Sequence, residues 1–272
     1  MAENINILFL GDIVGDAGMK IACEKLPVLI ECYNADCVVI NGENAYQGKG
    51  LNERQAEKLF AAGAHVITSG NHIWENWLSR PLLEKNQQVI RPYNYPRENQ
   101  GMGYAFHTLE SGQKVGVINL QGRTYMQSID CPFKGADEVL EIVKAETNIV
   151  FIDFHAEATA EKSALGWYLD GQVSALVGTH THVQTADACI LPRGTAFITD
   201  VGMCGAYNSV LGLKKEVAIK RFTLQTAHKY ESAGKDPRVC GVCVGVDTES
   251  GRAVKIENFT TPAARKTVEY QD

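Results

Sequence analysis

Short, nearly unbroken apolar segments recur along the chain, and this recurrence constrains the fold more than any other feature of the sequence. Such segments are typical of strands that are buried on both faces of a sheet. In the first third of the chain they occupy residues 5–10, 37–40 and 66–68; a glycine follows each within two residues, and a helix-like segment follows each of the first two. This order of strand, loop and helix predicts a layered α/β fold.

The helices of the first third are expected over residues 19–32 and 52–62. Asn52 is the expected N-cap of the second helix, and Pro27 is expected to kink or interrupt the first. Because no linker, repeat or low-complexity segment stands out, we expect a single domain over residues 1–272. The other expected elements are an extended loop over 88–96, strands over 104–106, 114–120, 149–154, 173–177 and 195–199, a hairpin of 239–246 with 253–259, and helices over 136–145, 158–169 and 215–224.

Composition and charge exclude several functional classes. Hydrophobic residues make up 45% and charged residues 21% of the chain, which is ordinary for a globular protein. The net charge of -6 offers no basic surface for general binding to duplex nucleic acid. The apolar runs are far shorter than the roughly 18 residues of a membrane span, and the amino end lacks a basic stretch followed by an apolar one. We therefore expect a cytoplasmic protein that does not associate with membranes.

The eight cysteines are scattered along the chain and are expected to be reduced. Cys37 and Cys189 lie inside apolar runs, where a thiol behaves as a small hydrophobic group. Cys240 and Cys243 form a CxxC pair without a second pair, which is only a weak sign of a zinc or redox site.

Polar side chains with metal-ligating capacity follow the predicted strands. The carboxyl ends of strands line the ligand crevice of an open α/β sheet, so residues far apart in the sequence converge there. We therefore expect these side chains to form one cluster from five loops. They are Asp12, Glu43, Asn44, Asn71, His155, His180 and His182.

Taken singly, most of these residues have another interpretation. Asp12 fits a turn or a helix cap, the asparagines fit turns, and His155 fits a structural histidine. Glu43 is harder to explain in this way, because turns do not especially require glutamate. His180 and His182 point to the same side if the backbone is locally extended, and paired imidazoles suit Zn, Fe, Mn or Ni better than Ca or Mg. The remaining histidines apart from His72 are interpreted as structural or exposed: His65, His107 and His228.

Seven candidate ligands exceed the three that a catalytic zinc ion usually takes. They fit two divalent metal ions about 3.5 to 4 Å apart that share a carboxylate, as in many phosphatases, nucleases and aminopeptidases. Because the donors are nitrogen and oxygen without cysteine, iron or manganese is favoured, and zinc also fits.

The order of these motifs resembles that of the calcineurin-like metallophosphoesterases. It is closer still to their YmdB-like branch, whose members are described as 2',3'-cyclic-nucleotide 2'-phosphodiesterases. The chain departs from the broad superfamily in having Ile13-Val14-Gly15 where a histidine is usual, Glu43 in place of an aspartate, and Ile73 after Asn71-His72. The motifs that carry the resemblance are Gly-Asp-x-x-Gly, Gly-Glu-Asn, Gly-Asn-His, Gly-Thr-His-Thr-His, and the segments at 153–159, 166–171 and 199–203.

The resemblance implies a β-sandwich of two mixed sheets flanked by helices. It also implies a division of the ligands between two metal ions, with Glu43 as the bridge. One ion would be held by Asp12, Glu43, Asn44 and His182, and the other by Glu43, Asn71, His155 and His180. The name of the branch implies that the 2' oxygen of a cyclic nucleotide leaves and a 3'-phosphate remains.

The hypothesis for the mechanism is hydrolysis by a metal-bridging hydroxide, which the two ions generate by lowering the pKa of a water molecule. His72 directly follows a candidate ligand, so it is the candidate general acid for the departing alkoxide. Asp153, Glu157 and Asp200 are candidates for orienting the imidazoles, with surface or capping roles equally open. The loop at 91–96 offers a cation and two aromatic rings for a phosphate and a base, with packing as the favoured alternative.

Other functions stay open at this point. Another dinuclear hydrolase, such as a phosphomonoesterase, an RNA nuclease or an aminopeptidase, would use a similar ligand set. A metal-bound regulatory or RNA-associated module would bind a nucleotide without turnover. The expected ligand is a small cyclic nucleotide or another phosphodiester, and homo-oligomerisation is the default for a soluble enzyme of this size.

Overall fold

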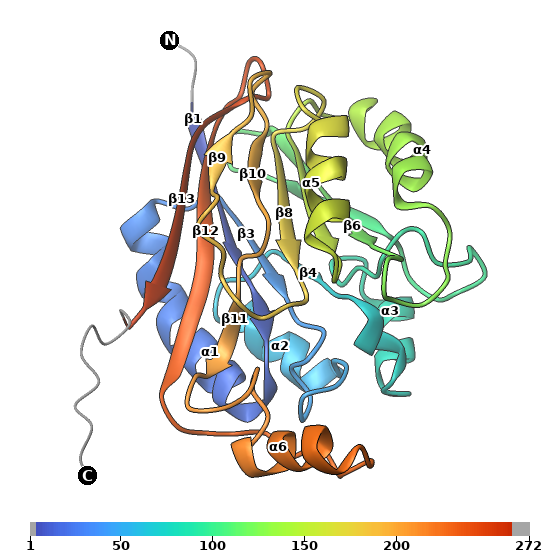
Figure 1. Cartoon of the computed structure of the whole chain (residues 1–272). Coiled ribbons are helices and arrows are strands. Elements are labelled where there is room, and N and C mark those ends of the chain that lie inside the picture. Colours follow the sequence, from blue (N-terminus) through green and yellow to red (C-terminus); the bar gives the residue numbers. More distant parts are fainter. Residues whose placement is uncertain (1–3, 263–272) are drawn as a thin grey trace.

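The computed structural model describes residues 4–262 as two mixed β-sheets that pack face to face (Figure 1). In the first sheet β1 pairs in parallel with β3 and antiparallel with β12, and in the second β7 lies in parallel between β6 and β8. The first sheet contains, in order, β2 (Asp12–Ile13), β11 (Met203–Ala206), β12 (Pro237–Asp247), β1 (Asn4–Leu10), β3 (Cys37–Asn41) and β4 (Val66–Thr68), with β13 (Ala253–Thr261) also paired to β12. The second contains β5 (Tyr104–Thr108), β6 (Lys114–Gln121), β7 (Val150–His155), β8 (Ala175–Thr179), β10 (Ala196–Ile198) and β9 (Cys189–Ile190).

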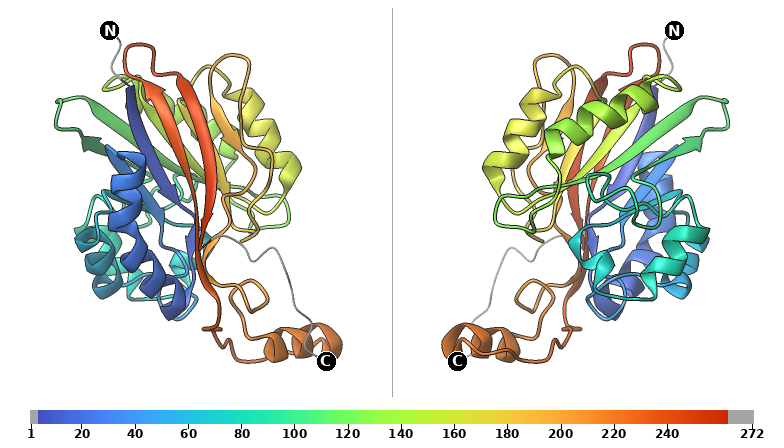
Figure 2. Two further views of the ribbon diagram at one scale, coloured as in Figure 1. Left: turned by 90° about the vertical axis from the view of Figure 1, so that its left-hand side faces the viewer. Right: turned by 90° about the vertical axis from the view of Figure 1, so that its right-hand side faces the viewer.

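Helices cover the outer face of each sheet, and α6 projects from one end of the molecule (Figure 2). The helices α1, α2 and α3 pack on the first sheet, and α4 and α5 pack on the second. Their bounds are α1 (Gly15–Tyr33), α2 (Glu53–Ala61), α3 (Ser79–Lys85), α4 (Pro132–Lys144), α5 (Thr159–Tyr168) and α6 (Lys215–Leu224), with a short 3-10 helix η1 (Asn71–Trp74).

Strand β1 shows why the sequence produces these layers. Successive side chains of a strand point to opposite faces, so an unbroken apolar run serves two cores. Ile7 and Phe9 lie between the two sheets, where the Phe9 and Phe151 rings are 5.4 Å apart. Leu8 and Leu10 point the other way, into the core beneath α1 and α2. A third core lies between the second sheet and the helices α4 and α5.

The predicted layered α/β fold, with two mixed sheets flanked by helices, is confirmed. The Asn52 side chain caps α2 by accepting a hydrogen bond from the Gln55 amide. Helix α1 continues through Pro27, so the predicted interruption does not occur. Pro27 lies on the exposed side of α1, where water can satisfy the carbonyl that lacks its N–H donor. The short elements β2, β9, β11, η1 and α3 were not predicted, because two to seven residues carry little periodicity.

All eight cysteines are free thiols, as expected. Four of them are buried, but Cys189 is exposed, so its interpretation as a core residue is wrong. Cys189 lies in the two-residue edge strand β9, where neither side chain is covered. Among the described residues, no helix combines the length and the apolar character needed to cross a membrane.

Candidate metal centre and active site

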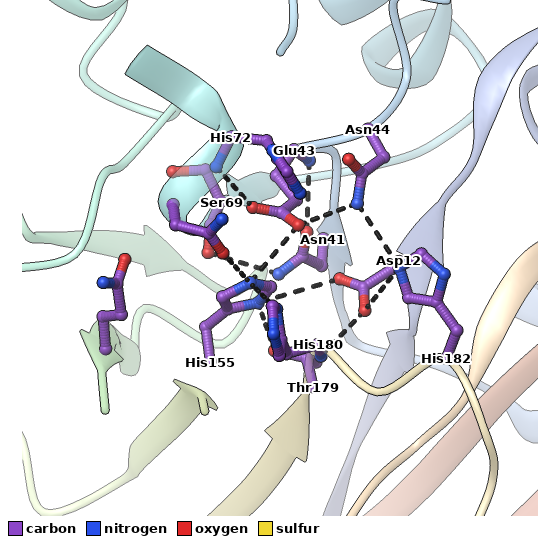
Figure 3. Close-up of polar contacts among 12 residues, drawn as sticks. Asp12, Asn41, Glu43, Asn44, Ser69, His72, His155, Thr179, His180 and His182 are labelled. Carbon is purple, nitrogen blue, oxygen red and sulfur yellow. Dashed lines mark hydrogen bonds and ion pairs between the residues drawn. The ribbon is translucent and has the colours of Figure 1, made fainter. Parts of the chain in front are cut away.

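The two sheets bring all seven predicted ligands to one place (Figure 3). Each residue lies in or just after a strand. Asp12 begins β2, Glu43 and Asn44 follow β3, Asn71 begins η1 after β4, His155 ends β7, and His180 and His182 follow β8. The expectation that loops distant in sequence converge at the carboxyl ends of strands therefore holds for every one of these residues.

His155 lies at the centre of the cluster. Its Nε2 atom is 3.0 Å from Asn71 Oδ1, 3.0 Å from His180 Nδ1 and 3.3 Å from Glu43 Oε1. Glu43, His155 and His180 have ligand atoms that all lie within 4.8 Å of one another. A single N–H of His155 can satisfy only one of these three neighbours, whereas a cation among them would satisfy all three.

A second set of donors lies on the other side of Glu43. His182 Nε2 is 3.6 Å from Asp12 Oδ2 and 3.4 Å from Asn44 Nδ2, which also donates to Glu43 Oε1 at 2.7 Å. Asn44 thus presents its amide nitrogen to the cluster, and it would have to turn the amide by about 180° to offer the oxygen that a metal ion needs.

Hydrogen bonds outside the cluster fix which ring nitrogens carry a proton. Thr179 Oγ1 donates to Asp153 Oδ1 at 2.7 Å and so accepts from His155 Nδ1 at 3.0 Å. Because the proton is then on Nδ1, a neutral His155 turns the lone pair of Nε2 toward Glu43. His182 Nδ1 in the same way faces the Leu211 carbonyl at 3.1 Å, which can only accept. Both imidazoles are thus oriented as metal ligands require.

The loop with His180 and His182 is not extended, so the condition under which strand alternation would turn both side chains to one side is not met. The φ angles are +98° at His180 and +66° at His182, a left-handed region that side chains rarely adopt. Both rings nevertheless face the cluster, because Thr181 between them is anchored. Its amide and hydroxyl donate to Asp200 Oδ2 at 3.1 and 2.8 Å, and the buried Lys162 donates to the same oxygen at 2.7 Å.

The titratable groups of the cluster shift one another's pKa values. Burial raises the pKa of Asp12 well above its usual range. The nearby Glu43 carboxylate raises it further, whereas His155 acts to lower it. Burial alone would also raise the pKa of Glu43, but His155 holds it well below its usual range. Burial disfavours a charged His155, yet Glu43 and Asp12 raise its pKa to about 9, and burial together with His155 lowers the pKa of His180 to about 3. His155 is therefore the group on which the ionised forms of both buried carboxyl groups depend.

Two further observations show that the residues fit a bound metal ion. Asp12 Oδ1 is buried and has no hydrogen-bond partner among the described residues. Such an orphaned buried oxygen is costly unless an ion or a water molecule satisfies it. Gly70 leaves the space open, because a Cβ there would lie 2.3 Å from His155 Nε2 and 2.4 Å from Glu43 Oε2. The nitrogen and oxygen donors suit iron, manganese or zinc.

His72 lies beside the cluster of the seven candidate ligands. Its amide donates to Glu43 Oε2 at 3.1 Å, and its Nδ1 is 2.7 Å from Glu75 Oε1. Glu75 is also paired with Lys49. The sequence analysis missed Glu75, although its position three residues after His72 in a helical turn is the signal that could have indicated the pair.

A cleft of about 350 Å³ opens above the cluster. It is lined by His72, Glu43, His180 and His182, together with Lys49 and Arg221. Each candidate for orienting the imidazoles also has a contact. Glu157 Oε2 is 3.1 Å from His180 Nε2, Asp153 acts on His155 through Thr179, and Asp200 holds Thr181.

The loop at 91–96 does not face this cleft. Arg91 and Tyr95 are buried, and the Arg91 guanidinium donates to the Pro92 and Tyr93 carbonyls at 2.9 and 3.0 Å. The packing role favoured for this loop is therefore the one observed, and the loop offers neither a cation for a phosphate nor an open ring for a base.

Comparison with known proteins identifies close relatives of this chain. A family model described as "YmdB-like protein" matches residues 8–259. The 2',3'-cyclic-nucleotide 2'-phosphodiesterase of Bacillus subtilis (strain 168) is 46% identical over 255 residues, which cover 94% of this chain and 96% of the relative. A putative phosphatase/phosphodiesterase of Mycoplasma pneumoniae is 37% identical over 270 residues, covering 94% of this chain and 93% of the relative.

Two solved structures share the fold. A hypothetical protein from Thermus thermophilus has a TM-score of 0.88 and 38% identity, covering 94% of this chain and 98% of its own. A novel phosphatase from Mycoplasma pneumoniae has a TM-score of 0.88 and 35% identity, covering 96% and 94%. These findings confirm the resemblance that the motifs indicated. The chain belongs to the YmdB-like protein family.

Proposed function

We propose that this chain is a metal-dependent phosphoric diester hydrolase that opens 2',3'-cyclic nucleotides and leaves the 3'-phosphate. The observation that carries the proposal is the convergence of seven nitrogen- and oxygen-bearing side chains in one cluster, four of which line a cleft together with His72. The name of the Bacillus subtilis relative supports the substrate class and the bond that breaks.

The proposed ligands form two sets that share Glu43. Asp12, Asn44 and His182 complete one set, and Asn71, His155 and His180 complete the other. Iron or manganese is the preferred metal for the two ions. When bound, two divalent ions would lower the pKa of a water molecule toward neutrality and offset the charge of the phosphate oxygens.

His72 is the proposed general acid, which protonates the departing 2' oxygen. Its position in the cleft supports this role, because the ring is held beside the cluster by Glu75 and is not consumed as a ligand. Because Nδ1 is bonded to the Glu75 carboxylate, Nε2 is the ring atom left to give a proton to the departing oxygen. Lys49 holds Glu75 in place through the neighbouring carboxylate oxygen.

The test is incubation of the protein, loaded with Mn(II) or Fe(II), with 2',3'-cyclic AMP, followed by chromatographic separation of 2'-AMP and 3'-AMP. We expect 3'-AMP. His72→Ala should lower turnover by about 10²- to 10⁴-fold and keep its metal ions, whereas His228→Ala, outside the cleft, should match the unchanged protein. Unaltered turnover of His72→Ala would overturn the acid assignment, and formation of 2'-AMP would overturn the choice of leaving oxygen. Absence of turnover with two bound ions would reject this substrate.

A phosphomonoesterase is the second candidate function. The Mycoplasma pneumoniae relative is named a putative phosphatase/phosphodiesterase, which supports a wider range of phosphoesters. The same chromatogram separates the two functions, because a phosphomonoesterase converts 3'-AMP to adenosine and inorganic phosphate. Persistence of 3'-AMP through a long incubation would confine the enzyme to diesters.

A further inference from the structure

Tyr125 is the most exposed large hydrophobic or aromatic side chain that borders the cluster. It lies in the loop between β6 and α4, and 89% of its surface is accessible. Its φ angle is +61°, a region that is unusual for a bulky residue. Such a conformation persists only where the surroundings impose it, and it is found most often at functional sites.

The loop that carries Tyr125 is held from both sides. The Glu161 carboxylate on α5 accepts hydrogen bonds from the Arg123 and Thr124 amides at 3.2 and 3.1 Å. On the other side, Tyr95 Oη lies 2.9 Å from Gln127 Oε1. The exposure of Tyr125 is therefore the result of a fixed loop that presents the ring outward.

Tyr125 lines a second cleft, of about 380 Å³, which begins at the candidate metal ligands. The other lining residues are Asn71, Met126, Gln127 and His180. His180 also lines the cleft that contains His72, so the two clefts meet at the cluster. Among the described residues that line the cleft beside Tyr125 there is no lysine or arginine, which makes it unsuited to a phosphate and suited to a neutral, flat group.

The cleft with His72 offers no comparable aromatic surface among the described residues that line it. Its tyrosine, Tyr230, is packed over Gly48, where a Cβ would lie 2.2 Å from Tyr230 Cε1. Lys49 in the same cleft is paired with Glu75. The proposed function sets the cyclic phosphate above the cluster, with its 2' oxygen toward His72. The cleft lined by Tyr125 then offers the base of the nucleotide an open ring to stack on, and the cleft with His72 does not.

We propose that Tyr125 is the platform on which the nucleobase of the substrate stacks, and that the Gln127 amide faces the edge of that base. The inference rests on the proposed function and adds the subsite that holds the base. The Gln127 amide lies beside Tyr125 in the lining of this cleft, within reach of the edge of a stacked base. Every nucleobase has a flat face and an edge with hydrogen-bonding groups, so all four cyclic nucleotides are accepted, the larger purines with lower KM.

The experiment compares steady-state kinetics of the unchanged protein, Tyr125→Ala and Tyr125→Phe on two substrates. One substrate is 2',3'-cyclic AMP, and the other is methyl riboside 2',3'-cyclic phosphate, which has no base. Stacking is worth about 1 to 3 kcal/mol, so Tyr125→Ala should raise KM for 2',3'-cyclic AMP by about 5- to 150-fold with kcat nearly unchanged. KM for the substrate without a base should not change, and Tyr125→Phe should behave as the unchanged protein.

Trp167→Ala is the matched control, because Trp167 is an exposed aromatic residue near the far end of α5. It should leave both substrates unaffected. Equal losses of Tyr125→Ala on the two substrates, or no change on 2',3'-cyclic AMP, would overturn the stacking assignment while leaving the proposed function intact. If the unchanged protein turns over neither substrate, the proposed function fails first and the base subsite falls with it.

Discussion

Strand β4 has histidines near both of its ends, and the two environments differ in what faces the rings. His65 precedes the strand and stacks on His107, with ring centroids 3.8 Å apart and planes at 8°. Beyond the other end, Asn71 and His72 lie beside His155, His180 and two buried carboxyl groups. The polar partner of His65 Nδ1 is the Val38 amide, which donates to it at 3.0 Å.

The difference separates a packed histidine pair from a candidate metal centre. Burial, with His107 nearby, lowers the pKa of His65 to about 4, so that ring stays neutral. Glu43 and Asp12 raise the pKa of His155 to about 9 despite burial. At that end, ligand atoms of Glu43, His155 and His180 all lie within 4.8 Å of one another. A buried carboxylate beside the ring, more than the histidine itself, marks the functional end of the strand.

Replacing one histidine at each end is the strongest way to test this comparison. His180→Ala should lose at least one of two metal ions per chain, since even the loss of a partner of a ligand typically lowers metal affinity about 10- to 100-fold. His107→Ala should keep both. Metal content after desalting, measured by atomic emission, gives the result without an activity assay. Retention of two ions by His180→Ala would contradict the proposed ligand set.

The sequence was sufficient to predict the cluster because the strand ends determine it. Glu43 comes three residues after the apolar run 37–40, and His155 directly follows that of 149–154. The ends of neighbouring parallel strands share one edge of a sheet. The layered fold followed from the same runs. Element bounds shifted by a few residues, as at β8, where the strand expected from residue 173 begins at Ala175.

The features that the sequence did not reveal depend on tertiary contacts. Lys162 looks like any surface lysine, and only the fold shows it buried against Asp200. For Tyr95 the sequence left a base-stacking role open beside packing, and only the fold shows that its ring is covered. Tyr125 was not singled out, because its exposure follows from a left-handed backbone at a residue other than glycine. The left-handed geometry of His180 and His182 likewise depends on the anchoring of Thr181.

Lys162 provides a second test, at the end of the molecule that holds the cluster. Its ammonium and the Asp200 carboxylate are both buried, and Lys162→Met would leave the carboxylate without its cation. Removing one partner of a buried ion pair typically lowers the free energy of unfolding by about 3 to 5 kcal/mol. Urea unfolding would measure the loss.

Lys114→Met is the matched control for that change, because Lys114 pairs with Glu146 on the exposed surface. Exposed pairs contribute about 0 to 1 kcal/mol. Equal stability of Lys162→Met and Lys114→Met would mean that the loop at His180 does not depend on the buried ion pair beneath it. This part of the contrast between the two ends of β4 would then fail.

The stacked pair of His65 and His107 gives the smallest expected effect. At this end of β4, protonation of a histidine should lower the stability of the fold. The pKa of His65 is about 4 in the folded state and near 6.5 in the unfolded chain. Its contribution to stability is therefore complete above pH 6.5 and is lost as the pH falls toward 4, because the unfolded chain then binds more protons. Asp36 and Glu110 line the same cavity, and their negative charge opposes this loss.

Since water reaches part of the pair and screens the repulsion, we expect a loss of about 1 kcal/mol, or about 2 to 4 °C in Tm, between pH 6.5 and 4. His65→Asn keeps an acceptor for the Val38 amide and cannot titrate, so its Tm should fall less over this range than that of the unchanged protein. His228→Asn, away from the pair, should follow the unchanged protein. Parallel Tm curves for His65→Asn and the unchanged protein would mean that this end of β4 tolerates a charge. The two ends of β4 would then differ only in their carboxylates, and both would accommodate a protonated histidine.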